Sequence, residues 1–303
     1  MNHFNMTKKL ITNKIVKIVK NKNYIVSSTV VGSFNSSPGL SGISDIDIVI
    51  IVDELSEKKF REIISEFEQI QCSEFQLNNY NVLVNSTFGP LKFNTKNNIV
   101  FHVMIYDING HIKHVEESPF TCSSWEKNLP IYGLSLKEVY PVLNLQISDI
   151  MSSRRGLSSY LNDIKKGVIT YRKYLFKNDS FQIIKEKFIL DKRHKLEYSF
   201  HITYHLLNNL YKIITLDTKD VEIKILADFF IKVDYDLNQN MLFFNNLYNW
   251  KKKNDEAPSN VMRKTSNFLN KIFQLVEKIY SNSVLISFYR HQRTNLNNGT
   301  FLG

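Results

Sequence analysis

The feature that most limits the fold of this chain is the stretch VVGSFNSSPGLSGISDIDIVIIV, at residues 30–52. It joins two runs of Val and Ile, which are typical of β-strands, through a loop rich in Gly and Ser. Two aspartates, Asp45 and Asp47, stand at the start of the second run. Because alternate residues of a strand share a face, both carboxylates are predicted on one face. The isoleucines and valines that alternate with them, from Ile46 to Val52, are predicted on an opposite, apolar face.

Two carboxylates on one face repel each other unless a positive charge lies between them. A hard divalent cation suits this place, and Mg²⁺ in particular takes one or two carboxylates together with substrate phosphates. The preceding loop has the groups that phosphates need. Gly32 permits a close backbone approach, and Ser33 offers both an amide and a hydroxyl. The stretch therefore indicates a site for a metal ion and phosphates.

The sequence before this stretch predicts a helix with a basic outer face. Residues 1–24 contain six Lys, and their Leu, Ile and Val recur at helical spacing, with Thr7 as a possible N-cap. Such a helix either lies on a membrane surface or packs on the protein's own core, and we favour the second.

The sequence after the stretch predicts the rest of a small α/β module. Ser56 is a natural N-cap for an amphipathic helix that continues to Ile70. Strands are predicted at residues 80–87 and 98–106, with a shorter one near 91–93.

The remainder of the chain predicts helices. Ser118 and Pro119 have the character of a cap and a first helical residue, and strand patterns are not evident beyond them. We therefore predict an α+β fold, in which a small mixed β-sheet with flanking helices is followed by an all-helical domain. The predicted boundaries are 1–24 for the basic helix, 25–117 for the sheet module, 118–290 for the helical domain and 291–303 for a frayed tail.

Charge is unevenly placed along the chain. The net charge of +10 divides into +6 for residues 1–24, −7 for residues 25–150 and +11 for residues 151–303. An acidic module between basic segments suits metal cations in the middle and a polyanion around it. The alternative interpretation is that the excess of Lys reflects a biased genome composition.

Several classes of protein have no support in the sequence. The Lys-rich start lacks the apolar run of a secretory signal, and no run of residues is long and apolar enough to cross a membrane. Cys72 and Cys122 are far apart, which argues against a disulfide framework or a zinc ribbon. Motifs of dinucleotide-binding folds, P-loops, zinc proteases and serine hydrolases are missing. A soluble cytoplasmic protein without a membrane partner is the simplest expectation.

The central motif has a close parallel in a known superfamily. Gly32-Ser33 at the end of a strand, eleven intervening residues, and Asp45-Ile46-Asp47 on a second strand resemble the signature of the DNA polymerase β-like nucleotidyltransferases. These include tRNA CCA-adding enzymes, poly(A) polymerases, antibiotic nucleotidyltransferases and nucleotidyltransferase toxins. The resemblance covers residues 25–107, and many members carry a helical domain afterwards.

The resemblance implies a catalytic site for Mg²⁺, or Mn²⁺, and a nucleoside triphosphate (NTP) such as ATP as co-substrate. Asp45 and Asp47 would be catalytic and ligate two metal ions together with the triphosphate. Gly32 and Ser33 would hold the β- and γ-phosphates. Ser44, directly before the pair, could add a hydroxyl contact.

The sequence departs from the superfamily at the third carboxylate, which usually lies mid-strand later in the sheet. In NIVFHVMIYD the apolar face begins with Ile99 and Phe101, so His102 falls on the opposite face, where an acid is expected. Asp107 has the wrong parity unless a bulge turns it inward. Imidazole is a poorer Mg²⁺ ligand but a competent general base. Four interpretations of His102 are open. It could deprotonate the acceptor directly, or it could bind one of the two metal ions weakly. Its presence could also mean that activity has been lost, or that the side chain only bonds a neighbouring strand.

Two weaker patterns lie in the helical part. Arg154 and Arg155 begin a segment of basic residues and tyrosines that suits a clamp on the triphosphate or contacts with RNA. The solvent-exposed faces of ordinary helices have the same pattern of residues. Glu197, His201 and His205 are four residues apart, a spacing that could bind zinc, but the interleaved apolar residues favour a packed helix.

The leading functional hypothesis is transfer of a nucleoside monophosphate (NMP) from an NTP to an acceptor hydroxyl. The basic segments favour RNA as the acceptor, especially a tRNA 3′ end, as in a toxin or processing enzyme. A small molecule such as an antibiotic or sugar, or a protein hydroxyl, are the alternatives, and no obligate protein partner is implied. The second class is a non-catalytic protein that binds nucleotide or RNA, and the role of His102 separates the two classes.

Overall fold

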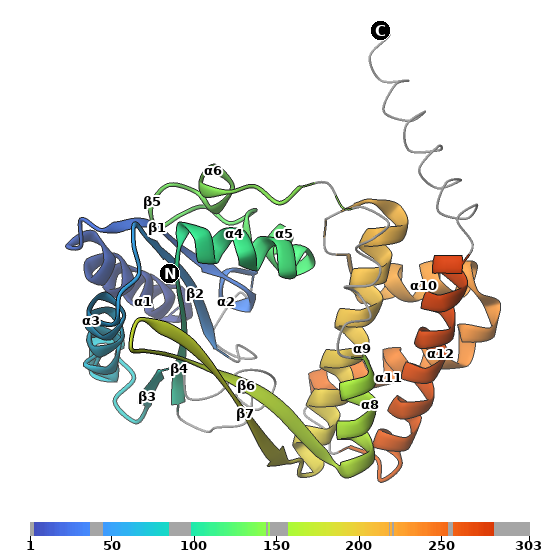
Figure 1. Ribbon diagram of the computed structural model, residues 1–303. Coiled ribbons are helices and arrows are strands. Elements are labelled where there is room, and N and C mark those ends of the chain that lie inside the picture. The colour runs from blue at the N-terminus through green and yellow to red at the C-terminus, as the bar shows by residue number, and fades with distance from the viewer. Residues whose placement is uncertain are drawn as a thin grey trace, which may run out of the picture. The chain divides into compact units, whose positions relative to one another are not determined.

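The Ile- and Val-rich runs form the central strands of a five-stranded sheet (Figure 1). The computed structural model describes residues 3–36, 45–84, 98–143, 145, 157–217, 219, 221–253 and 257–281. The chain divides into two compact units. The first is drawn from Met1–Val142 and Thr170–Lys187, and the second from Leu143–Ile169 and Phe188–Gly303.

The first unit begins with helices and strands in alternation. In chain order they are α1 (His3–Lys20), β1 (Ile25–Val31), α2 (Ser33–Ser36), β2 (Ile46–Val52), α3 (Glu57–Glu68), the 3-10 turn η1 (Cys72–Phe75), β3 (Asn81–Val84), β4 (Asn98–Asp107), α4 (Ile108–Glu117), α5 (Pro119–Trp125), β5 (Tyr132–Gly133) and α6 (Leu136–Val139). The predicted short strand at 91–93 lies outside the described residues.

The sheet has the strand order β3-β4-β2-β1-β5. β4 runs parallel to both β2 and β3, whereas β1 is antiparallel to β2 and β5. The sheet is therefore mixed, as predicted. β2 is the middle strand, with β4 and β1 on either side of it, and β2 and β4 are the two strands on which the sequence places the candidate site.

One face of the sheet is covered by α1 and α3 (Figure 1). The alternating residues of β2 from Ile46 to Val52, and those of β4 from Ile99 to Ile105, all belong to this core. Ile15 of α1 and Phe67 of α3 are fully buried against them. Burial of each large apolar side chain is worth about 1.5–3 kcal/mol, so this layer holds β2 and β4 in place. The predicted apolar faces of both strands are confirmed.

The opposite face has a smaller apolar core. Val49 and Ile51 of β2 are buried there with Met104 of β4 and Leu136 of α6, and Trp125 packs against them. Asp45 and Asp47 have the parity of Val49 and Ile51, so they lie on this face at the start of β2.

The ends of three helices test the predicted caps. Ser56 caps α3, because its hydroxyl accepts a hydrogen bond from the amide of Lys59 at 3.3 Å. Ser118 and Pro119 are the N-cap and first residue of α5. Thr7, by contrast, lies inside α1 and is buried rather than capping it, because the helix begins four residues earlier.

A β-hairpin stands where only helices were predicted. β6 (Val168–Lys177) and β7 (Ser180–Ile189) form a two-stranded sheet of their own. Asn178 and Asp179 at the turn have φ angles of 50° and 51°, the left-handed conformation of a tight type I′ hairpin turn. The prediction that strands end before Ser118 is therefore wrong. Asn-Asp between two runs of β-branched and aromatic residues was the signal for this hairpin.

The second unit is largely helical. Its helices are α8 (Leu157–Lys166), α9 (Lys192–Thr215), α10 (Ile223–Val233), η4 (Tyr235–Leu237, a 3-10 turn), α11 (Asn238–Lys253) and α12 (Val261–Ser281). α9 packs against α11 and α12, and α8 packs against α12. Among the described helices, none has the length and apolar character needed to cross a membrane.

Candidate active site

The strand register brings the two acids and His102 together. β2 and β4 are parallel neighbours in which Asp47 pairs with His102. Side chains of directly paired residues point to the same face of a sheet, so His102 projects beside Asp47. Asp45 lies two residues earlier on that face, just before β2 begins. The predicted parity of all three residues is thus found in the structure.

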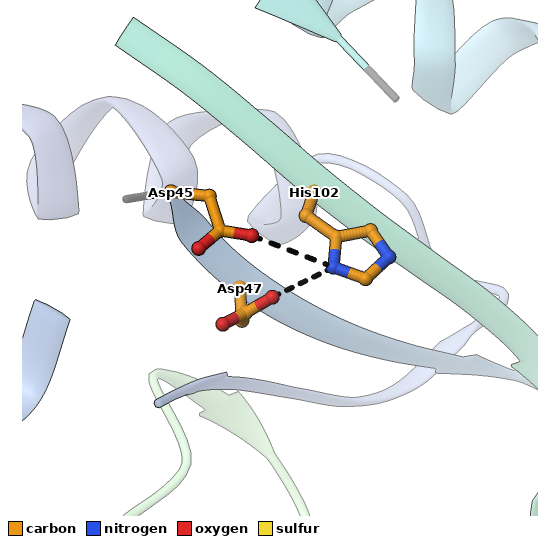
Figure 2. A group of neighbouring side chains, drawn as sticks. All are labelled: Asp45, Asp47 and His102. Atoms are coloured by element: carbon orange, nitrogen blue, oxygen red, sulfur yellow. Dashed lines mark hydrogen bonds and ion pairs between the residues drawn. The ribbon is translucent and has the colours of Figure 1, made fainter. Parts of the chain in front are cut away.

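The three side chains form one tight cluster (Figure 2). His102 Nδ1 lies 2.7 Å from Asp47 Oδ1 and 3.8 Å from Asp45 Oδ2. Because a carboxylate only accepts hydrogen bonds, Nδ1–H donates a hydrogen bond to Asp47 in this arrangement, and an imidazole that binds a cation through Nδ1 must carry its proton on Nε2 instead. Each side chain is partly exposed, at 12% for Asp45, 23% for Asp47 and 12% for His102. The cluster is therefore held by the sheet and still open to a ligand.

This donor set suits a divalent cation. One ligand atom from each side chain lies within 4.8 Å of those from the other two. Two atoms that bind one ion at ~2.1 Å are ~3 Å apart when they meet at a right angle. The 2.7 Å and 3.8 Å separations from the imidazole nitrogen lie on either side of that value. Two carboxylates and an imidazole also give a cation the charge and lone pairs that it needs.

Gly32 lies directly against the cluster. Val31, the last residue of β1, pairs with Asp47 across the antiparallel ladder, and Gly32 follows with a φ of 74°. A Cβ atom added at Gly32 would lie 2.5 Å from Asp47 Oδ2, closer than such atoms can approach. Only glycine has both the left-handed conformation and the space at this position. Ser33 follows as the first, half-buried residue of α2.

Two further residues hold the Gly32-Ser33 turn from either side. Phe34 is 2% exposed and anchors α2 in the core beneath the sheet. Asn35 Nδ2 donates to the carbonyl of Val30 at 2.5 Å and to Asn128 Oδ1 at 2.9 Å. The turn is therefore tied both to its own strand and to a residue 93 positions away in the sequence.

Asn128 is itself fixed by the end of α5. Its Nδ2 donates to the carbonyl oxygens of Ser124 and Trp125, at 3.1 and 3.0 Å. Sequence reasoning missed both Asn35 and Asn128. The position of Asn35, two residues after Ser33, was a local signal that it belongs to the turn. The sequence contains no signal that links Asn128 to the same turn.

Asp107 takes no part in the cluster. It is the N-cap of α4, where its Oδ1 accepts a hydrogen bond from the amide of Gly110 at 2.6 Å. An acid at an N-cap satisfies a helix amide and faces the positive end of the helix dipole. The position opposite Asp47 therefore belongs to His102.

The other predicted site residues are not brought to the cluster by the described structure. Ser44, Arg154 and Arg155 lie outside the described residues. On α9, Glu197 Oε2 forms an ion pair with Lys251 Nζ at 2.9 Å, and the rings of His201 and His205 have centroids 4.2 Å apart. Among the described residues, only Asp45, Asp47 and His102 form a metal-binding group, so the zinc reading of α9 gains no support.

A second histidine group packs on the same face of the sheet as the site, against the smaller apolar core. His114 of α4 stacks on Trp125 at 5.2 Å between ring centroids, and the Tyr106 hydroxyl lies 3.3 Å from His114 Nδ1. The pKa of His114 is lowered to about 4, mainly by burial and also by the charge of nearby His111, while Glu117 acts in the opposite direction. Burial also raises the pKa of Cys122 to about 12. These groups are neutral at pH 7, which is consistent with a packing role.

A mixed sheet that presents a Gly-Ser turn against two acids on the next strand is the arrangement of a nucleotidyltransferase. Residues 12–131 match the nucleotidyltransferase domain family. This part of the chain is therefore a DNA polymerase β-like nucleotidyltransferase domain, as the motif predicted, and it is followed by a largely helical region.

Other comparisons are more distant. The crystal structure of the spectinomycin adenyltransferase AAD(9) from Enterococcus faecialis, with ATP and spectinomycin, is similar at 13% sequence identity and a TM-score of 0.44. That similarity covers 87% of this chain and 98% of the other. None of the curated proteins matches the sequence. The functional assignment therefore stands on the domain family and on the site geometry.

Proposed function

We propose that this protein transfers an NMP from an NTP to an acceptor hydroxyl at the Asp45, Asp47 and His102 cluster. The supporting observation is the cluster itself, in which three metal-ligating groups lie against the Gly32 turn of a nucleotidyltransferase domain. The acceptor oxygen forms a bond to the α-phosphorus, the bond to the bridging oxygen of the β-phosphate breaks, and pyrophosphate leaves. The hydroxyl proton is lost to a base or to solvent.

Each residue of the site has a distinct task in this proposal. Asp45 and Asp47 would hold the divalent cation, which would supply positive charge to the triphosphate and the attacking oxygen. Gly32 leaves room for phosphate oxygens beside Asp47, and the Ser33 amide and hydroxyl bind the β- and γ-phosphates. Ser44, Arg154 and Arg155 stay in the proposal as phosphate contacts predicted from the sequence alone.

His102 takes the place of the third carboxylate. Its Nδ1 is directed at both aspartates rather than away from them, which favours a role toward the cation over a purely structural one. If His102 instead deprotonated the acceptor hydroxyl, it would use the same nitrogen, Nδ1. The imidazole therefore cannot bind the cation and act as the base at the same time. We propose the ligand role.

The proposed acceptor is RNA. The first 24 residues and residues 151–303 carry net charges of +6 and +11. Part of this charge lies on helices of the second unit, where the exposed Lys252 and Lys253 end α11. A basic surface gains affinity for a polyanion by releasing counterions. We assign the NTP chemistry to the first unit and acceptor binding to the second, with a tRNA 3′ end as the narrower expectation.

A transfer experiment tests the acceptor. The protein is incubated with each α-labelled NTP, Mg²⁺ or Mn²⁺, and in separate reactions total RNA, a panel of aminoglycosides and sugars, or a protein extract. We expect label in RNA at low salt, with a steep loss as salt rises. Label in the small-molecule or protein reactions alone would contradict the RNA acceptor.

The control for this experiment is the double variant Asp45→Asn/Asp47→Asn. It keeps the size of both side chains and removes their charge, so it should transfer no label to any acceptor. Label that the variant transfers equally well would contradict the proposed site. Absence of label with wild-type protein in every reaction, together with NTP binding, would favour the non-catalytic class.

A further inference from the structure

The third group of the site is an imidazole whose place is fixed by the sheet. His102 pairs with Asp47 in the ladder between β2 and β4. The residues on either side of it, Phe101 and Val103, are 0% and 3% exposed and belong to the core under α1 and α3. Turning the strand to move the ring away would pull these two side chains out of the core, which is unfavourable. The imidazole therefore stays beside the carboxylates.

We propose that Asp45, Asp47 and His102 bind Mn²⁺ in preference to Mg²⁺. This inference rests on the proposed function, because it concerns the cation that the transfer reaction uses. Mg²⁺ is a hard ion that prefers oxygen ligands and gives up its water reluctantly. Imidazole nitrogen is a softer ligand than a carboxylate oxygen, and Mn²⁺, unlike Mg²⁺, is a first-row transition metal that takes nitrogen ligands beside the carboxylate oxygens that suit both ions. A mixed set of two oxygens and one nitrogen thus fits Mn²⁺ better.

The charge of the cluster acts in the same direction. Asp45 and Asp47 contribute two negative charges, and a neutral imidazole contributes none. A third carboxylate at position 102 would add one more charge and one more oxygen ligand. Both changes would strengthen binding of Mg²⁺ more than binding of Mn²⁺. The substitution His102→Asp is therefore the direct test of what the imidazole does.

The experiment measures binding of the metal alone to the full-length protein. The electron paramagnetic resonance signal of free Mn²⁺ reports its binding, and Mg²⁺ is added as competitor. We expect wild-type protein to bind Mn²⁺ more tightly than Mg²⁺ by about tenfold or more. His102→Asp should lower that ratio by about tenfold, mainly because Mg²⁺ binds more tightly.

Two further variants serve as controls for the charge of the side chain at position 102 and for metal binding by another histidine. His102→Asn has the size of the Asp variant without its charge, so it should lower the affinity for Mn²⁺ about tenfold without improving that for Mg²⁺. His205→Ala removes an exposed histidine from the His201–His205 pair on α9, a second pair of imidazoles in this chain, and should change neither affinity. Circular dichroism spectra and melting curves confirm that each variant is folded.

The outcomes separate the two proposals. If the ratio of the two affinities is the same in wild type and in His102→Asp, the preference does not come from the imidazole and the inference is overturned. If Asp47→Asn leaves Mn²⁺ binding unchanged, the cation binds elsewhere, and the metal site of the proposed function fails as well. Loss of binding in Asp47→Asn with a shifted ratio in His102→Asp supports both.

Discussion

Gly32 and Asp47 are so close that no other residue fits at position 32. A Cβ atom there would lie 2.5 Å from Asp47 Oδ2, and the φ of 74° is itself unfavourable for a side chain. This single contact joins the turn that is proposed to bind phosphates to the carboxylate that is proposed to bind metal. The structure thereby explains why glycine precedes serine in the motif.

The first prediction concerns Gly32→Ala. The added methyl must displace the Asp47 carboxylate, so we expect kcat/KM to fall by about 100-fold or more, the loss typical of a displaced catalytic group. The strained φ should cost about 1–2 kcal/mol of the free energy of unfolding. Transfer kinetics and urea unfolding measure the two effects.

Gly167→Ala is the matched control for that prediction. Gly167 also has a positive φ, 64°, but a Cβ atom built there meets nothing within 4 Å. The control should lose similar stability and keep its activity. Equal losses of activity in the two variants would show that the contact with Asp47 is not what makes Gly32 necessary.

The second prediction concerns the bond between Asn35 and Asn128. Asn35→Ala frees the turn, and the KM for NTP should rise several-fold while kcat changes little, because the proposed metal ligands are untouched. Asn35→Asp should be worse, because its carboxylate would face the carbonyl of Val30 and Asn128 Oδ1. A double-mutant cycle with Asn128→Ala should give a coupling free energy of about 1 kcal/mol. Additive effects in that cycle would mean that the two residues act independently.

The third prediction concerns the pH dependence of stability. Burial lowers the pKa of His114 from its ordinary value of 6.5 to about 4. The unfolded chain therefore binds a proton that the folded chain does not, at every pH between these values. Stability from this group is fully present above pH 6.5 and is lost as the pH falls toward 4, by about 3 kcal/mol in all.

Trp125 fluorescence can follow this effect. Trp125 stacks on His114, and Trp250→Phe removes the second of the two tryptophans. In that background, the free energy of unfolding in urea should fall between pH 7 and pH 5. His114→Phe keeps a ring against Trp125 and has no proton to gain, so its free energy should fall less steeply. Identical slopes in the two proteins would refute the role of His114.

The fourth prediction concerns the tip of the hairpin. Glu57 at the start of α3 accepts from the amide of Asn178 at 2.6 Å and donates its own amide to Asp179 Oδ1 at 2.8 Å. Glu57→Ala removes the first bond. The tip should open more easily by about 1–2 kcal/mol, and trypsin should cleave after Lys177 about 5–30 times faster.

Arg61→Ala is the control for the hairpin. Arg61 is 67% exposed and pairs with the same Glu57 carboxylate without touching the tip in any described contact. Surface pairs of this kind are worth little, so cleavage should stay near the wild-type rate. If trypsin cleaves Glu57→Ala no faster than wild type, the hairpin is held by other contacts. One such contact is between the rings of Phe60 and Phe176, whose centroids are 5.7 Å apart.

Local patterns predicted the part of the site that depends on neighbours in the sequence. Asp45 and Asp47 share a face because they are two residues apart, and His102 was assigned from the alternation along its own strand. The packing of Asp47 beside His102 is a register between strands 55 positions apart, which only the folded sheet reveals. Asn128 was missed for the same reason.

The missed hairpin has a different cause. β6 and β7 are rich in Lys and Glu as well as in β-branched and aromatic residues, so they read equally well as charged helices. The turn at Asn178 and Asp179 was the decisive local feature, because two left-handed residues break a helix and close a hairpin. Tertiary pairing then overrides the weak helical preference.

The central claim is that the cluster of Asp45, Asp47 and His102 performs metal-dependent nucleotidyl transfer. The most direct test measures pyrophosphate release from NTP in the presence of acceptor, Mn²⁺ or Mg²⁺, for wild type and Asp47→Asn, with NTP binding measured on both proteins. We predict release by wild type only, no release without a divalent cation, and retained folding in the variant. Pyrophosphate release by Asp47→Asn at the wild-type rate would contradict the claim.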